Sequence, residues 1–270
     1  MKFKIEKLLP ALPRLLTEQM DSLLKDVMSH LIAVEAWPEQ GLILPRLQAH
    51  RGSCNDGAQE NTLMSFRAAK KKGALMVECD VQLSKDRIPI LFHDYDLQRL
   101  AGISKKVSQC TRDELRDLVK APSLKELLTD SESPRFVNIE LKSRARFDDP
   151  LERKVAEVVK EVRAENRVLF SSFNPFSIYR ISLYLPDVPR ALLVTDKEDE
   201  DNHFLLRKML LAPLISFHCL NLDQDMVNET SLKIWKERKI PVVLWTVNGA
   251  ANIQKFLKMG AISVITDTIV

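Results

Sequence analysis

The chain contains 270 residues, of which 45% are hydrophobic and 29% are charged, with a formal net charge of +3. This hydrophobic fraction can build a buried core, which excludes a disordered or fibrous chain, and the length suits one α/β barrel. The small excess of positive charge gives no sign of nucleic-acid binding, so we expect no nucleic-acid partner.

Glycine and cysteine patterns exclude several kinds of site. The 7 glycines form no Gly-x-Gly-x-x-Gly motif, which excludes a dinucleotide site of that type. No Cys-x-x-Cys pair is present, which argues against a disulfide scaffold and a structural zinc site; the four cysteines are Cys54, Cys79, Cys110 and Cys219. The sequence shows neither the apolar stretch of a secretory signal nor a run of about 20 apolar residues. We therefore expect a soluble, cytoplasmic protein.

Residues 1–46 are predicted to form an N-terminal helical extension. Apolar residues follow the three-and-four spacing of an amphipathic helix from about Leu12 to Val34. We expect this helix to pack across the barrel as a lid or a floor. Contact with a membrane or a partner is the less favoured alternative, because the polar face mixes acidic and basic residues. The oligomeric state is not predicted.

Residues 47–270 are predicted to form one barrel domain, because short apolar runs alternate with amphipathic stretches. Nearly continuous apolar runs are typical of parallel strands buried on both faces. Each run ends in polar residues, which favours a TIM (β/α)8 barrel over an open doubly wound sheet. The main runs are 75–77, 88–92, 136–139, 167–170, 191–194, 242–245 and 263–265, and the helical stretches are 61–72, 150–164, 202–211, 227–238 and 249–259.

Nine candidate strands are one too many for this barrel. Residues 80–83, the turn 84–87 and residues 88–93 are predicted to form a hairpin folded back on itself. Such a hairpin would return His93 to the height of Glu78. Which strands close the barrel is left open.

Acidic residues gather at two of the predicted strand ends. Side chains two residues apart share a face of a strand, so Glu78 and Asp80 point together, and so do Glu140 and Lys142. Buried carboxylates that nothing neutralises cost on the order of several kcal/mol each. A divalent cation is the simplest remedy, and oxygen ligands favour Mg²⁺ or Ca²⁺ over Zn²⁺. Glu78, Asp80 and Glu140 are therefore predicted to bind a metal.

Two of the five histidines, His50 and His93, follow predicted strands next to these acidic clusters. An unperturbed imidazole has a pKa near 6.5, so such a pair can act as base and acid at neutral pH. We predict that His50 and His93 are catalytic.

An ordered series of motifs runs from about Leu47 to the C-terminus: His50-Arg51-Gly52, Glu60-Asn61-Thr62, Glu78-Cys79-Asp80, His93-Asp94, Asn138-Ile139-Glu140-Leu141-Lys142, Trp245-Thr246-Val247-Asn248 and Thr266-Asp267. This combination resembles the glycerophosphodiester phosphodiesterase family, whose fold is a phosphatidylinositol-phospholipase-like TIM barrel. The resemblance implies metal-dependent hydrolysis of glycerophosphodiesters to glycerol 3-phosphate and an alcohol.

The resemblance also implies roles for individual residues. His50 and His93 would be the acid/base pair, and the three carboxylates would hold the metal, usually Mg²⁺ or Ca²⁺. The residues implied to bind the substrate are Arg51 and Lys142 at the phosphate, Trp245 as an apolar wall, and Glu60 and Asn61, which would brace the first loop. The substrate pocket is expected to be compact and shallow, because no large insertion fits between His93 and Glu140.

Two alternatives stay open at this point. One is phospholipase D-type cleavage of lysophospholipids. The other is a barrel that binds a phosphoester without turning it over.

Overall fold

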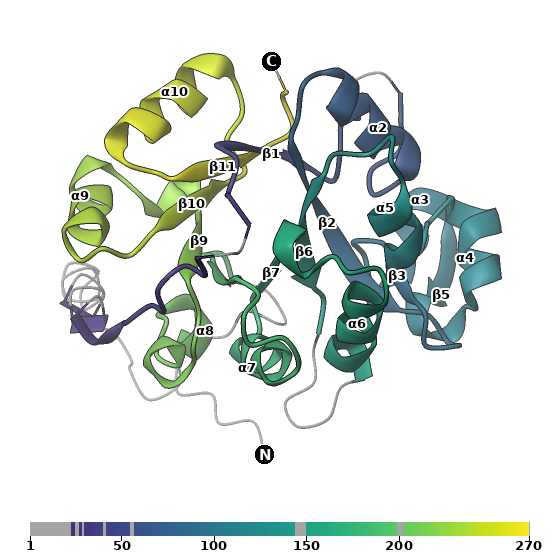
Figure 1. The fold of residues 1–270 in the computed structure, drawn as a ribbon, viewed down its shortest axis with the longest axis horizontal. Coiled ribbons are helices and arrows are strands. Elements are labelled where there is room, and N and C mark those ends of the chain that lie inside the picture. The colour runs from purple at the N-terminus through teal and green to yellow at the C-terminus, as the bar shows by residue number, and fades with distance from the viewer. Residues whose placement is uncertain are drawn as a thin grey trace, which may run out of the picture.

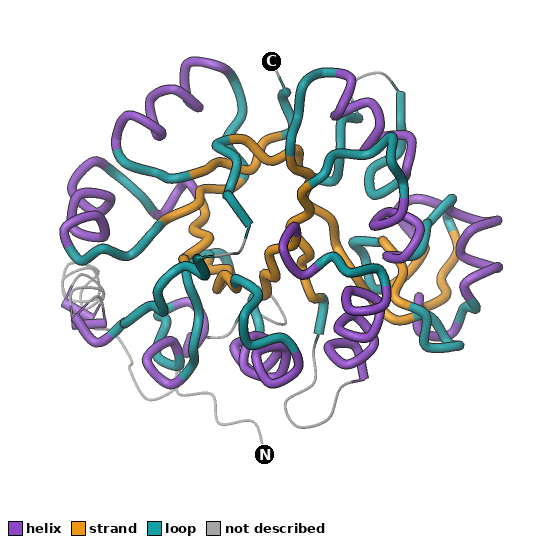
Figure 2. The backbone as a smooth tube through the Cα atoms, in the orientation of Figure 1, coloured by secondary structure: helices purple, strands orange, loops and turns teal. Residues whose placement is uncertain are grey.

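A computed structural model describes residues 23–24, 27–28, 30–39, 42–54, 57–143, 150–198, 202 and 204–269. Eight parallel strands form a closed ring with helices around it (Figures 1 and 2). The ring strands are β1 (Leu47–His50), β2 (Met76–Leu83), β6 (Phe136–Leu141), β7 (Val168–Ser172), β8 (Arg190–Val194), β9 (Cys219–Asp223), β10 (Val242–Trp245) and β11 (Ser263–Thr266). Because β1 pairs with both β11 and β2, the barrel is closed, and the predicted TIM barrel is confirmed.

The helices that cover the ring are α2 (Leu63–Lys71), α5 (Leu124–Thr129), α6 (Pro150–Glu161), α7 (Pro175–Tyr184), α8 (Phe204–Arg207), α9 (Glu229–Glu237) and α10 (Ala250–Met259), with short 3₁₀ turns η3 (Glu165–Arg167), η4 (Ala212–Leu214) and η5 (Gln224–Met226). Local sequence signals explain where several of them begin. Helix α2 starts after Thr62, whose side chain accepts the backbone N–H of Ser65 in a capping box. Its inner face then buries Phe66 and Ala69 against the strands.

The predicted hairpin is confirmed. Strand β3 (Pro89–Leu91) runs antiparallel to β2, with Leu91 opposite Val81, and lies outside the closed ring. After β3 the chain forms a side unit, residues 94–119, beside the barrel (Figure 1). The side unit contains β4 (Asp96–Leu97), α3 (Gln98–Ala101), β5 (Ile103–Lys106), η2 (Val107–Gln109) and α4 (Arg112–Val119). Leu97 and Leu115 of this unit belong to an apolar cluster that also includes Phe92, just after β3.

Strand β9 was not among the predicted runs, because Asn221 and Asp223 interrupt its apolar pattern. Both side chains are buried, so a polar residue in this strand does not indicate exposure to solvent.

Alternation along β2 and β6 separates an apolar layer from a polar interior. Cys79, Ile139 and Leu141 belong to the cluster under the surrounding helices, as predicted from the two-residue period. Inside the ring, Asn138 donates to the Gln48 side chain, and Gln48 donates in turn to Ser263. The barrel interior is thus a packed, hydrogen-bonded layer, and the open space lies beyond it at the strand ends.

The segment before β1 closes the opposite end of the barrel. Leu42 is 1% exposed and packs in a cluster with Met76, Leu169 and Val243. The predicted helix from Leu12 to Val34 lies largely outside the described residues, so its packing stays a prediction. Within the described chain, no helix is both long and apolar enough to cross a bilayer.

Arg190 ties this segment to the barrel. Its buried guanidinium pairs with Glu35, at 2.7 Å, and donates to the Pro186 and Val188 carbonyls. The backbone N–H of Arg190 donates to Nδ1 of His218 at 3.1 Å, so this imidazole acts as an acceptor. Burial, together with the Arg190 charge, lowers the pKa of His218 to about 4.

We expect the free energy of unfolding to fall as the pH drops from about 6.5 to 4, partly because of His218. An unfolded histidine has a pKa near 6.5, so between these values the unfolded chain binds the extra proton. We expect this residue to contribute about 2 kcal/mol of the loss, since the half-exposed Glu35 carboxylate offsets part of the effect.

Urea unfolding at several pH values checks this prediction. His218→Asn can keep an acceptor for the Arg190 amide but cannot titrate, so its stability should depend less on pH over this interval. Parallel pH curves for the two proteins would contradict the assignment.

Candidate active site

A cavity of about 900 Å³ opens at the carboxyl ends of the strands. Seven of the residues predicted from the sequence line this cavity. Trp245 lies on one side, and the other side holds His50, Arg51, Glu78, His93, Glu140 and Lys142. The structure therefore brings together side chains that are spread over almost 200 residues of sequence. The expectation of a compact pocket is wrong in size, because residues of the loops after β7 and β8 also line the cavity, and its shallowness stays a prediction.

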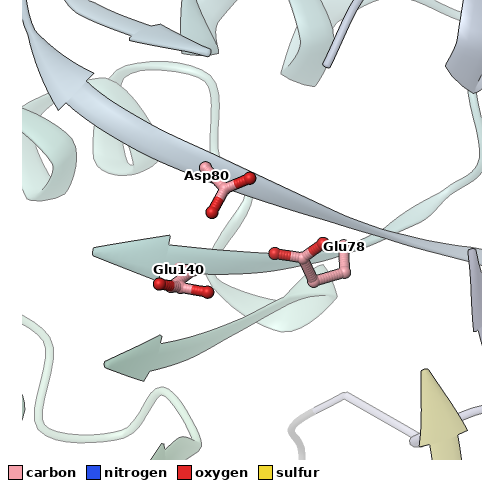
Figure 3. A group of neighbouring side chains, drawn as sticks. All are labelled: Glu78, Asp80 and Glu140. Atoms are coloured by element: carbon pink, nitrogen blue, oxygen red, sulfur yellow. The ribbon is translucent and has the colours of Figure 1, made fainter. Parts of the chain in front are cut away.

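The three predicted metal-binding carboxylates converge (Figure 3). One carboxylate oxygen each of Glu78, Asp80 and Glu140 lies within 4.8 Å of the other two. The register of the sheet explains this arrangement, because β2 and β6 are parallel neighbours with Asp80 opposite Glu140. Glu78 follows the same face of β2, two residues earlier.

Two cations neutralise part of this charge, and an amide donates a hydrogen bond to it. Lys142 Nζ lies 3.1 Å from Glu140 Oε1 and 3.7 Å from Asp80 Oδ1, and Arg51 Nε lies 3.2 Å from Asp80 Oδ2. Asn61 Nδ2 donates to Asp80 Oδ2 at 2.9 Å. Burial by itself would raise the pKa of Asp80, but Lys142 and Arg51 hold it well below its usual range.

Glu78 is compensated less: its carboxylate accepts the Arg51 backbone N–H at 3.1 Å, and the charges of His50 and Arg51 offset only part of the effect of burial. Burial, reinforced by the neighbouring Asp80 charge, raises the pKa of Glu78 to about 8. In addition, Asp80 Oδ1 accepts no hydrogen bond although it is buried. Three carboxylates lie beside two cations, and one buried carboxylate oxygen accepts no hydrogen bond. This all-oxygen donor set fits a hard divalent cation.

Both predicted catalytic imidazoles are held by a carboxylate at Nδ1. His50 Nδ1 lies 2.6 Å from Asp267 Oδ1, and His93 Nδ1 lies 2.7 Å from Asp94 Oδ1. A carboxylate can only accept, so Nδ1 carries the proton and Nε2 is the nitrogen left for the pocket. Burial lowers the pKa of His50, but the hydrogen bond to Asp267 and the charges of Glu78 and Asp267 together outweigh burial and raise the pKa overall.

Asp267 is in turn fixed by Asn248. The Asn248 side chain donates to Asp267 Oδ2 at 2.8 Å and accepts the Asp267 backbone N–H at 2.9 Å. Asp94, Asn248 and Asp267 stand in the family motifs, but no role was predicted for them. The position of Asp94 directly after His93 could have indicated from the sequence that the two side chains pair. The pairing of His50 with Asp267 could not, because it depends on β11 lying next to β1.

A tight turn after β1 aims Arg51 at the carboxylates. Arg51 has a φ of 54° and its backbone N–H donates to the Glu78 carbonyl at 3.0 Å. Gly52 follows with a φ of 91°, and a Cβ there would lie 2.4 Å from Ser65 Oγ. Only glycine fits this close approach between the first loop and helix α2.

Glu60 and Asn61 reach the site indirectly. Asn61 is 1% exposed and bonds Asp80 through both its amide oxygen and its amide nitrogen. Glu60 accepts from Arg51 at 3.2 Å. Neither residue lines the cavity, so their contacts hold Asp80 and Arg51 in place.

The wall opposite the charged cluster carries most of the apolar side chains of the cavity. It is built by Phe173, Phe176, Leu193, Leu205, Leu206 and Trp245, from the segments that follow or end β7, β8 and β10. The Phe173 and Trp245 rings pack edge to face with centroids 5.4 Å apart, and Trp245 Nε1 donates to the Asn221 carbonyl. The apolar side chains of this wall alternate with polar ones, among them Thr195 and Lys197 after β8, and face the charged cluster at the ends of β1, β2 and β6.

The fold is a TIM barrel, and its strand ends carry oriented imidazoles, clustered carboxylates and cations. These features define a TIM-barrel enzyme whose site suits a phosphoester. Residues 50–270 match the profile of the "Glycerophosphoryl diester phosphodiesterase family", and the chain therefore belongs to this family.

Similar proteins carry the same family name. A glycerophosphodiester phosphodiesterase from Caldanaerobacter subterraneus is 29% identical over 232 residues, which cover 81% of this chain and 92% of the relative. The crystal structure of a glycerophosphodiester phosphodiesterase from Thermotoga maritima matches with a TM-score of 0.64 at 25% identity, covering 84% of this chain and 96% of that one. A phosphodiesterase from Oleispira antarctica, in complex with the product sn-glycerol-3-phosphate, matches with a TM-score of 0.66 at 26% identity, covering 83% and 93% of the two chains.

Proposed function

We propose that this chain hydrolyses glycerophosphodiesters to glycerol 3-phosphate and an alcohol. The observation that carries the proposal is the single cavity in which two carboxylate-oriented imidazoles lie beside three carboxylates and two cations. Family membership supports the reaction, and the sn-glycerol-3-phosphate bound to the Oleispira antarctica relative supports the product. The four unpaired cysteines support a cytoplasmic location.

Arg51 and Lys142 are proposed to bind the phosphate of the diester. An arginine offers a planar fork of donors and a lysine offers a compact charge, and both suit phosphate oxygens. Trp245 is proposed to support the apolar part of the substrate from the opposite wall.

Glu78, Asp80 and Glu140 are proposed to hold a divalent cation, Mg²⁺ or Ca²⁺. When bound, such an ion supplies positive charge that polarises a phosphoryl oxygen.

His50 and His93 are proposed to move the protons of the reaction at Nε2. One imidazole takes the proton of the attacking hydroxyl, which belongs to water or to the glycerol of the substrate. The other gives a proton to the oxygen of the leaving alcohol. Asp267 and Asp94 keep both rings in the tautomer that this exchange needs.

Release of glycerol 3-phosphate from glycerophosphocholine and glycerophosphoethanolamine tests the proposal. We expect turnover with Mg²⁺ or Ca²⁺, loss of turnover with EDTA, and recovery when the ion is restored. Metal binding without hydrolysis of any glycerophosphodiester would overturn the proposal and favour a barrel that only binds phosphoesters.

Phospholipase D-type cleavage of lysophospholipids is a second candidate. It is favoured by the apolar wall, whose Phe176 and Leu205 line the cavity and are also exposed at its mouth. A single acyl chain could lie along this wall while the phosphate meets the charged side. The cavity of about 900 Å³ is near the upper end of the range for small-molecule sites, roughly 300–1,000 Å³.

A series of lysophospholipids with increasing chain length separates the two candidates. If the chain lies on the wall, kcat/KM should rise by up to about fourfold for each methylene buried, which corresponds to about 0.8 kcal/mol. Leu205→Asn should flatten this rise. Leu118→Asn is the matched control, because Leu118 is as exposed as Leu205, 46% against 48%, and lies in the side unit. Turnover of water-soluble diesters alone would exclude the second candidate.

A further inference from the structure

Arg99 connects two carboxylates at the edge of the active site. It belongs to α3 in the side unit, next to the barrel (Figure 1). Its Nε donates to Asp94 Oδ2 at 2.6 Å, and its two terminal nitrogens donate to Glu60, at 2.5 and 3.3 Å. One guanidinium therefore holds two acidic side chains from different loops.

Each of these carboxylates also contacts a proposed functional residue. The other oxygen of Asp94 lies 2.7 Å from Nδ1 of His93, and Glu60 Oε1 lies 3.2 Å from a terminal nitrogen of Arg51. The result is a continuous chain from His93 through Asp94, Arg99 and Glu60 to Arg51. An imidazole lies at one end and a cation proposed to bind phosphate lies at the other.

The chemistry of arginine suits this bridge. A guanidinium is planar and presents donors in two fixed directions, whereas an ammonium is a single point charge. Although burial raises the pKa of Asp94, the hydrogen bonds from Arg99 and His93 lower it overall. Asp94 is thus kept ionised as an acceptor for the His93 ring.

The side unit does not need Arg99 to stay on the barrel. It packs through the cluster that includes Phe92, Leu97 and Leu115, and β3 is paired with β2. The Arg99 side chain is 48% exposed, and ion pairs at exposed sites contribute little to the free energy of folding. Stability alone therefore does not account for a bridge between two residues of the active site.

We propose that Arg99 is a positioning residue that orients His93 through Asp94 and Arg51 through Glu60. The inference rests on the proposed phosphodiesterase function, since it assigns Arg99 a part in that reaction. A positioning residue acts through its neighbours, so its loss should alter kinetics more than folding.

The test compares Arg99→Ala and Arg99→Lys with Arg112→Ala. Arg112 is the matched control: it also bridges two carboxylates, Asp113 and Glu126, but lies away from the cavity. For glycerophosphoethanolamine we expect Arg99→Ala to lower kcat/KM by about 10- to 100-fold, with effects on both kcat and KM. Arg99→Lys should recover part of the loss, because one ammonium can hold only one carboxylate well.

Added guanidinium ion at millimolar concentration should rescue Arg99→Ala in part and should not activate Arg112→Ala. Arg112→Ala should have the kcat/KM of the natural chain, even if its Tm is lower. Unchanged kcat/KM in Arg99→Ala, or a loss that follows the fraction of unfolded protein and shows no rescue, would overturn the proposal.

The NMR signal of the His93 Nδ1–H separates this inference from the proposed function. In metal-free protein the signal should shift or broaden in Arg99→Ala and stay in place in Arg112→Ala. An inactive natural chain that shows this NMR difference would refute the proposed function and leave the positioning role supported. Identical His93 signals in all variants would refute the positioning role itself.

Discussion

His50→Ala and His93→Ala should each lower kcat for glycerophosphodiesters by about 100- to 10,000-fold, because each removes a group proposed to transfer a proton. Substrate binding should change less, since Arg51 and Lys142 remain. Steady-state assays of glycerol 3-phosphate release, with Tm measured alongside, check this result.

Two further variants show whether the imidazoles act chemically or structurally. His218→Asn is the control, because His218 is a buried histidine at the other end of the barrel and should not affect kcat at neutral pH. Asp267→Asn keeps the contact with His50 but not the charge, so we expect a smaller loss of about 10- to 100-fold. Full turnover in either histidine-to-alanine variant would refute the proposed acid/base pair.

Glu78→Gln should have opposite effects on activity and stability. Activity should fall by about 100-fold or more, because a bound cation contributes several kcal/mol of charge stabilisation. The metal-free protein should become more stable at pH 8, because the folded natural chain must there either take up a proton at the buried Glu78 or hold its charge without an adequate counter-charge. Each kcal/mol gained should raise Tm by about 2–4 °C.

The pH dependence of this effect has a defined sign. The pKa of Glu78 is about 8 in the folded chain and near 4.5 in the unfolded chain, so the folded state binds more protons between these values. The metal-free protein should therefore lose stability as the pH rises through this interval, and Glu78→Gln should lose less. Thermal unfolding with EDTA, followed by titration with Mg²⁺ or Ca²⁺, measures both effects.

Glu152→Gln is the matched control for a buried carboxylate. Glu152 is fully buried and lies 2.8 Å from Arg180, outside the acidic cluster. Its replacement should lower Tm, because it removes the buried ion pair between Glu152 and Arg180, and should not change metal binding. If Glu78→Gln lowered Tm as Glu152→Gln does, or still bound the ion as the natural chain does, the proposed metal site would be wrong.

Much of the fold could be predicted because it depends on local periodicity. The continuous apolar runs predicted buried parallel strands, and the turn at 84–87 predicted the hairpin that returns His93 to the site. The two-residue period of a strand placed Glu78 and Asp80 on one face. Strand β9 was not predicted, because Asn221 and Asp223 point into a polar interior and break the apolar pattern on which strand prediction depends.

The sequence by itself determined which chemical groups stand at the strand ends, since each motif is local and its residue types limit its chemistry. Only the tertiary structure decided how these groups meet. Asp80 lies opposite Glu140 because of the register between β2 and β6, and His50 reaches Asp267 because closure of the barrel joins the first strand to the last. The physical reason is that the sheet register, the barrel closure and the packing of the side unit are set by contacts between distant segments. The bridge through Arg99 and the apolar wall depend on those contacts, so no pattern along the chain could predict them.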